Sequence, residues 1–269
     1  MNAFAELLKA RATKVPVGTW IMSASPIVVE AVGCAGFDWG VIDMEHTPLD
    51  LMDLVHMLQA VGNTPMQPVV RVPWNDTVQV KRVLDAGART LLFPFIQNAE
   101  EATRAVAATR YAPAGVRGMA GMSRGSRFGT TPDYFKVAND GICNLLQMET
   151  VESVAQLEAI AAVPGVDALF VGPGDLSGTM GHVGQLTHPE VMKVMADAAK
   201  RANAIGKPIG TVGGNPETVA QYRAMGYDYV AVASDLGLLM RAAQAAAAAL
   251  RAIDAPPAAK APAPRQEGY

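Results

Sequence analysis

Two acidic residues each stand just past an apolar, strand-like run: Glu149 in LLQMET and Asp175 in VGPGDLS. One amphipathic helical segment separates the two runs. In an α/β barrel all strands are parallel, so residues just past consecutive strands lie side by side around one mouth. Two carboxylates there suit Mg²⁺ or Mn²⁺, which takes one or two protein carboxylates and fills its remaining positions with water and substrate oxygens. The alternative interpretation makes both acids N-caps or first-turn charges of helices.

Three further polar residues, Asp43, Glu45 and His46, lie at the end of the run WGVIDME. The two-residue period of a strand sends Asp43 and Glu45 to the same side, so both line the mouth if they face inward. An imidazole titrates near neutrality, and beside two carboxylates at a strand end it suits proton transfer. The alternative for His46 is a hydrogen-bonded structural histidine.

An arginine in a strand and a glycine-containing turn are further candidates for the site. Arg71 is embedded in the apolar run QPVVRVP, where it forms an internal salt bridge or holds an anionic oxygen with its fixed fork of donors. In GPGDLS, the backbone N–H groups of Gly172 and Gly174 allow close approach by a carboxylate or phosphate. The turn is not a P-loop, because GxxxxGK[ST] is absent, and no GxGxxG follows the first strand.

Other chemistries find no support in the sequence. A Schiff-base barrel enzyme needs a desolvated lysine inside the barrel, but these lysines lie on helices, before strands or in the tail. The GxSxG elbow of serine hydrolases is absent. Of the remaining histidines, His56 is expected on a helix face, whereas His182 and His188 lie in a connection with no partner visible in sequence.

Eight short apolar runs alternate with helical patterns, and their lack of strict alternation is typical of parallel strands buried on both faces. This order predicts a single α/β domain, a (β/α)₈ TIM barrel, with a doubly wound open sheet as the alternative. The predicted strands are 17–23, 39–45, 67–73, 90–95, 142–148, 167–173, 207–212 and 228–234.

Length and composition bound the rest. Residues 1–253 are predicted to form the barrel, and the Pro/Ala-rich tail 254–269 is predicted to be disordered. The net charge of −3 with no basic face argues against a nucleic-acid partner. No apolar run is expected to reach the roughly 18 residues of a membrane span, and Cys34 and Cys143 are interpreted as buried thiols in a reducing compartment. A cytoplasmic protein without membrane partners is therefore expected.

Two connections are longer than turns. The first, residues 111–140, lies between a helix and the next strand, so it starts from the face opposite the active site and is expected to serve a neighbouring subunit if it serves chemistry. Its arginines, Arg117, Arg124 and Arg127, are expected to make subunit contacts or carry solvated charge, with anion binding as the alternative. The second connection, residues 172–188, follows a strand and lies at the catalytic mouth.

The motifs GTWIMSASPIVVEAVGCAGFDWGVIDMEHTP, QPVVRVPWND, RYAPAGVRG, LLQMET and FVGPGDLS occur in this order. Together they resemble the metal-dependent class II pyruvate aldolases of the 4-hydroxy-2-oxoheptanedioate aldolase type over residues 15–250. The resemblance implies a (β/α)₈ barrel assembled as a homo-oligomer, a hexamer with an exchanged C-terminal helix. It also implies reversible aldol cleavage of 4-hydroxy-2-oxo acids to pyruvate and an aldehyde.

Position by position, the resemblance makes Glu149 and Asp175 the ligands of a divalent metal, Mg²⁺ or Mn²⁺, with Co²⁺ as a further candidate. The other metal positions go to water and to the carboxylate and keto oxygens of pyruvate. Arg71 is expected to stabilise the enolate oxygen. His46 is expected to pair with Asp85 of VLDAGA as the acid–base dyad.

The resemblance also assigns Gln147 and the backbone of Gly172 and Gly174 to substrate binding, and Asp43 and Glu45 to the surroundings of the metal's waters. Gly174 stands where relatives often carry alanine, which widens the room beside the substrate methyl group and would admit hydroxypyruvate. Deprotonating carbon 3 of a 2-oxo acid places charge on the keto oxygen. A Lewis-acidic metal and a guanidinium located there stabilise that charge selectively in the transition state.

Two other functions share part of this pattern. A carbon–carbon lyase acting on CoA thioesters, of the citramalyl or malyl type, has the same barrel, carboxylates and arginine, but the sequence offers no basic surface for CoA phosphates. A non-catalytic oxo-acid-binding protein would keep the metal and Arg71 without needing the pair of His46 and Asp85.

Overall fold

The computed structural model describes residues 2–253 and shows a closed barrel of eight parallel strands, each paired with the next and β8 paired with β1. All eight predicted strands are confirmed, and the open doubly wound sheet is excluded. The tail 254–269 lies outside the described residues. The strands are β1 (Val17–Ile21), β2 (Trp39–Asp43), β3 (Gln67–Arg71), β4 (Thr90–Phe93), β5 (Cys143–Met148), β6 (Ala168–Val171), β7 (Ile209–Gly213) and β8 (Tyr229–Ser234).

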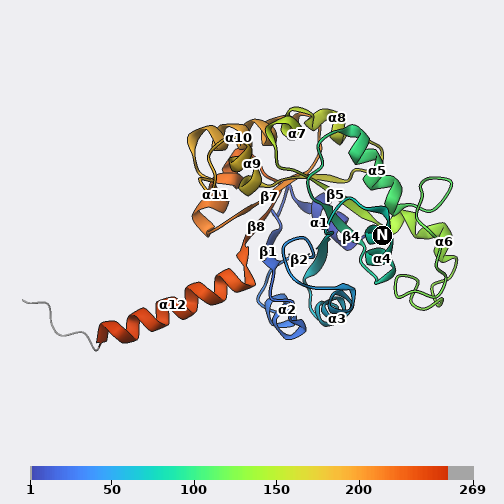
Figure 1. The fold of residues 1–269 in the computed structure, drawn as a ribbon, viewed down its shortest axis with the longest axis horizontal. Coiled ribbons are helices and arrows are strands. Elements are labelled where there is room, and N and C mark those ends of the chain that lie inside the picture. The colour runs from blue at the N-terminus through green and yellow to red at the C-terminus, as the bar shows by residue number, and fades with distance from the viewer. Residues whose placement is uncertain (1, 254–269) are drawn as a thin grey trace, which may run out of the picture.

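Helices surround the barrel in the order that the apolar periodicity predicts (Figure 1). Several begin at an Asp, Asn or Thr whose side chain accepts a hydrogen bond from a free amide of the first turn, as at Asp50, Asp76 and Asn98. The helices are α1 (Ala3–Ala10), α2 (Pro26–Gly33), α3 (Leu51–Val61), α4 (Thr77–Asp85), α5 (Ala99–Thr109), α6 (Tyr134–Val137), α7 (Val151–Ala155), α8 (Leu157–Ala161), α9 (Pro173–Thr179), α10 (Pro189–Ala204), α11 (Pro216–Met225) and α12 (Asp235–Ile253).

Helix α1 closes the amino-terminal end of the barrel. Its Phe4 is buried and meets Trp39 and Tyr229 edge-on, with ring centroids 5.7 Å apart in both pairs. Trp39 and Tyr229 are the first residues of β2 and β8, so this aromatic cluster fills the bottom of the barrel. A ligand therefore has to enter at the carboxyl ends of the strands.

The two long connections differ in structure. Residues 111–140 contain only α6 and a short 3₁₀ turn, Asn139–Gly141, and they pack against the end of α4, where the Gly125 amide donates to the Asp85 carbonyl. This is the amino-terminal side of the barrel, as predicted. The connection 172–188 is not a plain loop, because α9 occupies its first half. The burial predicted for Cys34 is wrong, since its side chain is exposed, whereas Cys143 is buried as predicted.

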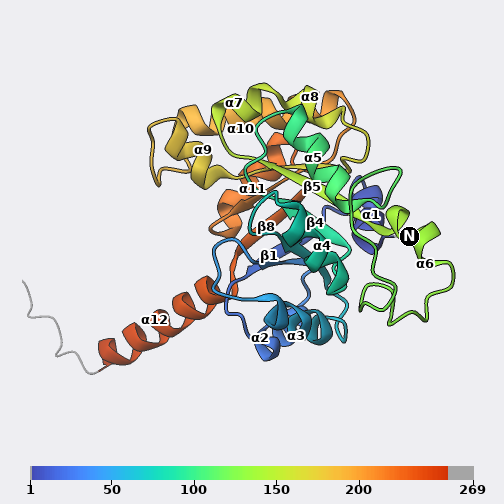
Figure 2. The same cartoon turned by 45° about the vertical axis from the view of Figure 1, so that its right-hand side comes forward.

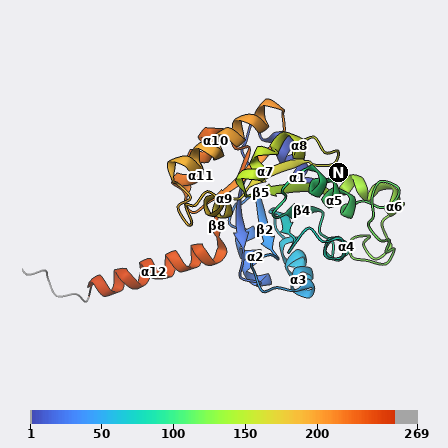
Figure 3. The same ribbon diagram turned by 45° about the horizontal axis from the view of Figure 1, so that its top comes forward.

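Helix α12 projects away from the barrel in all three views (Figures 1, 2 and 3). Its apolar side chains Leu239, Met240, Leu250 and Ile253 are exposed. By length and composition alone it qualifies as a membrane-spanning helix, with a mean hydropathy of 1.3. The expectation that no such run exists is therefore wrong, although one helix of this kind is weak evidence for a membrane.

Candidate active site

A cavity of about 380 Å³ opens at the carboxyl ends of the strands. It collects side chains or backbone from β1 through α12, so it is assembled by the whole barrel. Most residues singled out in the sequence line this one cavity: His46, Arg71, Gln147, Glu149, Gly172, Gly174 and Asp175. The barrel topology thus brings together groups that are up to about half the chain apart in sequence.

Glu149 is a buried carboxylate held in one orientation. It follows β5, is 2% exposed, and accepts hydrogen bonds from the Phe95 amide at 2.8 Å and from the Gln147 side-chain amide at 2.6 Å. Burial raises its pKa to about 7, although the hydrogen bonds from Gln147 and Phe95 oppose this shift. The carboxylate is therefore positioned, but among residues 2–253 no positively charged side chain forms a salt bridge with it.

Two carboxylates hold Arg71 in place, that of Asp43 at the end of β2 and that of Glu45 just beyond it. In the parallel register Asp43 lies directly beside Arg71, and it accepts from Nε at 2.9 Å and from Nη2 at 2.6 Å. Glu45 lies 2.9 Å from Nη1. Burial lowers the pKa of Arg71, but the hydrogen bond and the charges of Asp43, Glu45 and Glu149 outweigh this and raise it. A guanidinium has five N–H donors, so these three contacts leave two for a ligand.

Arg71 therefore forms the internal salt bridge that the sequence suggested and also lines the cavity, where it could hold an anionic oxygen. The salt bridge fixes the orientation of the guanidinium. The Trp20 ring, whose centroid lies 5.4 Å from the Arg71 guanidinium carbon, supports it from β1. Asp43 is fully buried behind Arg71 and does not line the mouth. The sequence placed Asp43 and Glu45 at the mouth only if both face inward, and neither lines the cavity, because both carboxylates contact Arg71.

Three acidic residues, Glu149 and Asp175 in the cavity wall and Glu45 beside it, lie close enough for their charges to interact. Burial raises the pKa of Glu45 to about 7; Arg71 lowers it, while Asp43 and Asp175 raise it further. The charges of Glu45 and Asp175 likewise raise the pKa of Glu149. Carboxylates that destabilise one another's ionised forms in this way need a cation or protons nearby. Their oxygen donors are those that Mg²⁺ and Mn²⁺ prefer, so Glu149 and Asp175 fit a divalent metal.

Gly172 makes room for the Glu149 carboxylate. A Cβ at Gly172 would lie 2.5 Å from Glu149 Oε2 and 3.0 Å from Gln147 Nε2, so no larger residue fits. Its amide donates to the Met148 carbonyl at 3.1 Å, so the expectation that this N–H binds substrate is wrong. The amide of Gly174, in the first turn of α9, has no partner within its helix. The Gln147 Oε1 atom and the Glu45 Oε2 atom are buried without a hydrogen-bond partner within the described residues.

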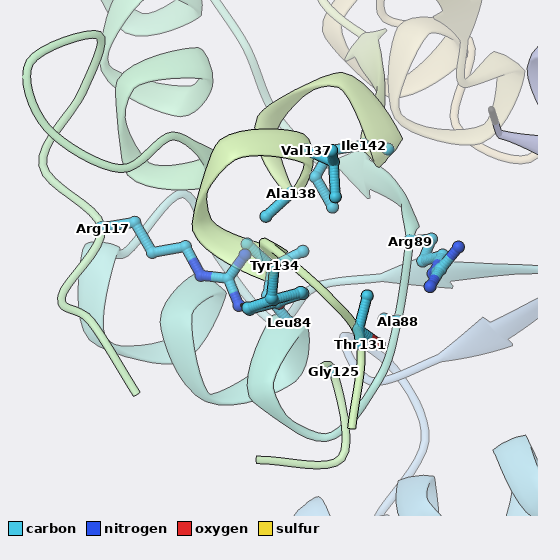
Figure 4. A pocket seen from close by; sticks show the side chains of 11 residues that line it. Leu84, Ala88, Arg89, Arg117, Gly125, Thr131, Tyr134, Val137, Ala138 and Ile142 are labelled. Carbon is cyan, nitrogen blue, oxygen red and sulfur yellow. The ribbon is translucent and has the colours of Figure 1, made fainter. Parts of the chain in front are cut away.

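His46 and Asp85 do not meet within one chain. His46 lines the cavity with a side chain that is 58% exposed, and its Nε2 lies 3.7 Å from Glu45. Asp85 ends α4, which runs back to the opposite end of the barrel, and it accepts from the buried Arg117 at 2.8 Å. Figure 4 shows Arg117 reaching toward Tyr134, which accepts from it at 3.4 Å. The predicted dyad is therefore not formed inside a single subunit.

The arginines of residues 111–140 have separate environments. The guanidinium carbon of Arg117 lies 4.5 Å from the Tyr111 ring centroid, and the guanidinium also pairs with Asp85. These contacts are within the chain, whereas subunit contacts or solvated charge were expected. Arg124 donates to the Ala86 carbonyl at 3.0 Å, whereas Arg127 is exposed.

Some residues that line the cavity or contact its lining were assigned no role from the sequence. Phe95 has a left-handed backbone, with φ at 55°, which directs its amide to Glu149, and its ring stacks on Trp74. Leu186 and Arg241 reach the cavity from the segment before α10 and from α12. Only the aromatic pair gave a signal in the sequence, because Phe95 ends the predicted strand 90–95 and Trp74 follows the predicted strand 67–73.

Comparison with known proteins gives a consistent result. A model of the HpcH/HpaI aldolase/citrate lyase family matches residues 17–242. A 2-dehydro-3,6-dideoxy-6-sulfogluconate aldolase of Pseudomonas putida is 51% identical over 90% of this chain and 95% of its own length. A pyruvate aldolase of Rhizobium etli and a 4-hydroxy-2-oxo-heptane-1,7-dioate aldolase of Salmonella paratyphi A are each 45% identical, over 89% and 92% of this chain and 94% of each relative.

Among solved structures, an HpcH/HpaI aldolase/citrate lyase family protein from Burkholderia cenocepacia superimposes with a TM-score of 0.89 at 40% identity. The match covers 93% of this chain and 100% of that one. The resemblance seen in the motifs is thereby confirmed at the level of the family and of the fold. The chain belongs to the HpcH/HpaI aldolase/citrate lyase family and is an enzyme of the lyase class.

Proposed function

We propose that the protein catalyses the reversible, divalent-metal-dependent aldol cleavage of 4-hydroxy-2-oxo acids to pyruvate, or hydroxypyruvate, and an aldehyde. The observation that carries this proposal is the meeting, in one cavity, of the buried Glu149, the mouth residue Asp175 and a spare pair of Arg71 donors. Glu149 and Asp175 would hold Mg²⁺, Mn²⁺ or Co²⁺, which as a Lewis acid would polarise the keto group of the substrate.

Arg71 stabilises the charge that develops on the keto oxygen when the carbon–carbon bond breaks. Its two free N–H groups suit an enolate oxygen, and its contacts with Asp43 and Glu45 fix their direction before the substrate arrives. Preorganised donors need no reorientation during the reaction, so their stabilisation acts mainly on the transition state.

His46 accepts the proton of the C4 hydroxyl during cleavage and returns it during condensation. Its exposure at the cavity wall leaves a ring nitrogen open to the aldehyde side of the substrate, and Glu45 is the carboxylate of the same chain nearest to it. The Gly174 amide, together with the Gln147 Nε2 proton that Glu149 does not accept, would donate to the substrate carboxylate. The donor methyl group would lie near Gly174, where an added Cβ meets nothing within 4 Å, so a hydroxymethyl group also fits.

We also propose that the protein assembles as a homo-oligomer, the hexamer that the resemblance to the aldolases implies. The apolar side chains of α12 are exposed on the single chain, and a second copy would bury them if the helix packs against it. In such an assembly, Asp85 of one subunit would lie near His46 of a neighbouring subunit, and the dyad would form between subunits. The CoA-thioester lyase and the non-catalytic binding protein are not favoured, because the relatives named above are aldolases.

The test is cleavage of 4-hydroxy-2-oxo acids, followed by coupled detection of pyruvate, before and after exhaustive chelation. Activity should disappear with chelation and return with Mg²⁺, Mn²⁺ or Co²⁺. Glu149→Gln and Asp175→Asn should weaken metal binding, whereas Glu152→Gln, an exposed acid on α7, should behave as wild type. Full turnover in metal-free protein would refute the metal-dependent mechanism, and no cleavage with any 2-oxo acid donor would refute the reaction.

A further inference from the structure

Two histidines and a glutamate that the proposed reaction does not use gather beside the cavity. His182 follows α9, His188 caps α10 and Glu190 lies in the first turn of α10. The His182 and His188 rings are stacked with centroids 3.6 Å apart and planes 18° apart, and His182 Nε2 lies 2.9 Å from Glu190 Oε2. One ligand atom from each residue falls within 4.8 Å of the others.

The chemistry of this group differs from that of the active-site carboxylates. Two imidazole nitrogens and one carboxylate oxygen form a borderline-soft donor set, which suits Zn²⁺, Co²⁺ or Ni²⁺ better than Mg²⁺. His188 Nδ1 presents its lone pair and accepts only a long contact, 3.3 Å, from the Glu190 amide. Ligation through Nδ1 would replace this capping contact, whereas ligation through Nε2 would keep it.

To bind one ion, the two stacked rings must turn so that their planes converge, because an imidazole holds a metal in its own ring plane. Ligand bonds of about 2.0–2.1 Å in a tetrahedral site place the donor atoms roughly 3.3 Å apart. The present separation between His182 and Glu190, 2.9 Å, is already close to this value. Glu190 is 69% exposed, and the segment before α10 turns at Gly181 and Gly184 with φ of 80° and 75°, so both sides can adjust.

We propose that His182, His188 and Glu190 form a second metal site, separate from Glu149 and Asp175, that binds a transition metal such as Zn²⁺ and leaves a fourth position to water. Ligation ties the segment after α9 to the start of α10. Leu186 lies between the two histidines and lines the substrate cavity, so the bound ion fixes one wall of that cavity. The role is one of positioning, and it does not depend on the proposed reaction.

The decisive experiment is Co²⁺ titration of untagged protein in saturating Mg²⁺, read by visible absorption. Tetrahedral Co²⁺ absorbs far more strongly than octahedral Co²⁺, so wild type should show an intense band that saturates at one Co²⁺ per chain and disappears with Zn²⁺. His182→Gln and Glu190→Gln should each weaken this binding at least about tenfold, the smallest effect typical of losing even an outer partner of a metal ligand.

Two control variants separate this site from other sources of the signal. His56→Gln removes an exposed histidine on α3 and should keep the band. Glu149→Gln should also keep it, which makes the outcome independent of the active-site metal. Absence of a saturable band in wild type, or an unchanged band in His182→Gln, would overturn the proposal. Hydrogen exchange of residues 180–188 should slow on Zn²⁺ addition in wild type alone, and unchanged exchange would overturn the positioning role.

Discussion

Glu149 provides the sharpest link between the candidate metal site and a measurable property, the free energy of unfolding. In the folded, metal-free chain its pKa is about 7, against 4.5 for the unperturbed group. Ionising this carboxyl therefore costs about 3 kcal/mol more in the folded chain than in the unfolded chain. Because the folded pKa is the higher one, the stabilising contribution is complete below pH 4.5 and is lost as the pH rises through 7.

Glu149→Gln should remove this loss while keeping the local hydrogen bonds. The new amide keeps an oxygen for the Phe95 N–H, and a flip of the Gln147 amide would present its unpartnered Oε1 to the new NH₂ group. In the presence of a chelator, the variant should equal wild type near pH 4.5 and exceed it by up to about 3 kcal/mol at pH 8. The corresponding rise in melting temperature is roughly 6–12 °C for a chain of this size.

Thermal unfolding between pH 4.5 and 8, with chelator and with Mg²⁺, measures both effects. Mg²⁺ should stabilise wild type, because a ligand that binds only the folded state shifts the equilibrium, and it should not stabilise Glu149→Gln. Glu152→Gln is the matched control, an exposed acid that should change neither profile. A variant less stable than wild type at pH 8 without metal, or one with the same pH profile, would refute the view of Glu149 as a buried charge that requires a cation.

Four further substitutions test the remaining groups. Arg71→Lys should lower kcat/KM severely although the charge is retained, because an ammonium cannot contact Asp43 and a substrate oxygen with a fixed fork; near-normal kinetics would leave only the structural salt bridge. His46→Ala should lose about 10²–10⁴ in cleavage rate with pyruvate binding retained, as calorimetry would show. Asp85→Asn should lower the melting temperature, since it leaves the buried Arg117 without its carboxylate; an unchanged melting temperature would contradict this. Gly174→Ala should reduce kcat/KM for hydroxypyruvate more than for pyruvate, and equal effects on both donors would reject the assigned position.

The fold followed from the sequence because strand and helix periodicities alternate without interruption. All eight strands were found, but several predicted strands run past the observed carboxyl end, as at β2, β3 and β6. There the apolar pattern continues into residues such as Val72 and Pro173, which leave the ladder to build the mouth. Sequence periodicity records burial, and burial does not stop where strand pairing stops.

The site was predicted where parallel topology alone decides it, as for Glu149, Asp175 and Arg71. The predictions were less accurate where the direction of a side chain, and not its place along the strand, determines its contacts. The two-residue strand period puts Asp43 on the same side as Glu45 and so predicts it at the mouth if that side faces inward. In the structure both of its carboxylate oxygens accept hydrogen bonds from Arg71. His46 and Asp85 lie at opposite ends of the barrel, so their pair does not form within one chain, and its formation between subunits stays a prediction.

The burial of Arg71 by Asp43 also explains why a guanidinium is suited to this position better than any other charged group. A buried cation must be compensated, yet full compensation would leave nothing for a substrate. The planar fork resolves this conflict, since Asp43 takes the Nε edge, Glu45 takes one Nη1 contact, and two N–H groups still face the cavity. Glu45, whose charge acts together with that of Asp175 on Glu149, also raises the local negative charge that a divalent metal would neutralise. The negative charge that would bind a metal therefore lowers the stability of the metal-free protein. The pH dependence of unfolding in Glu149→Gln would measure this cost.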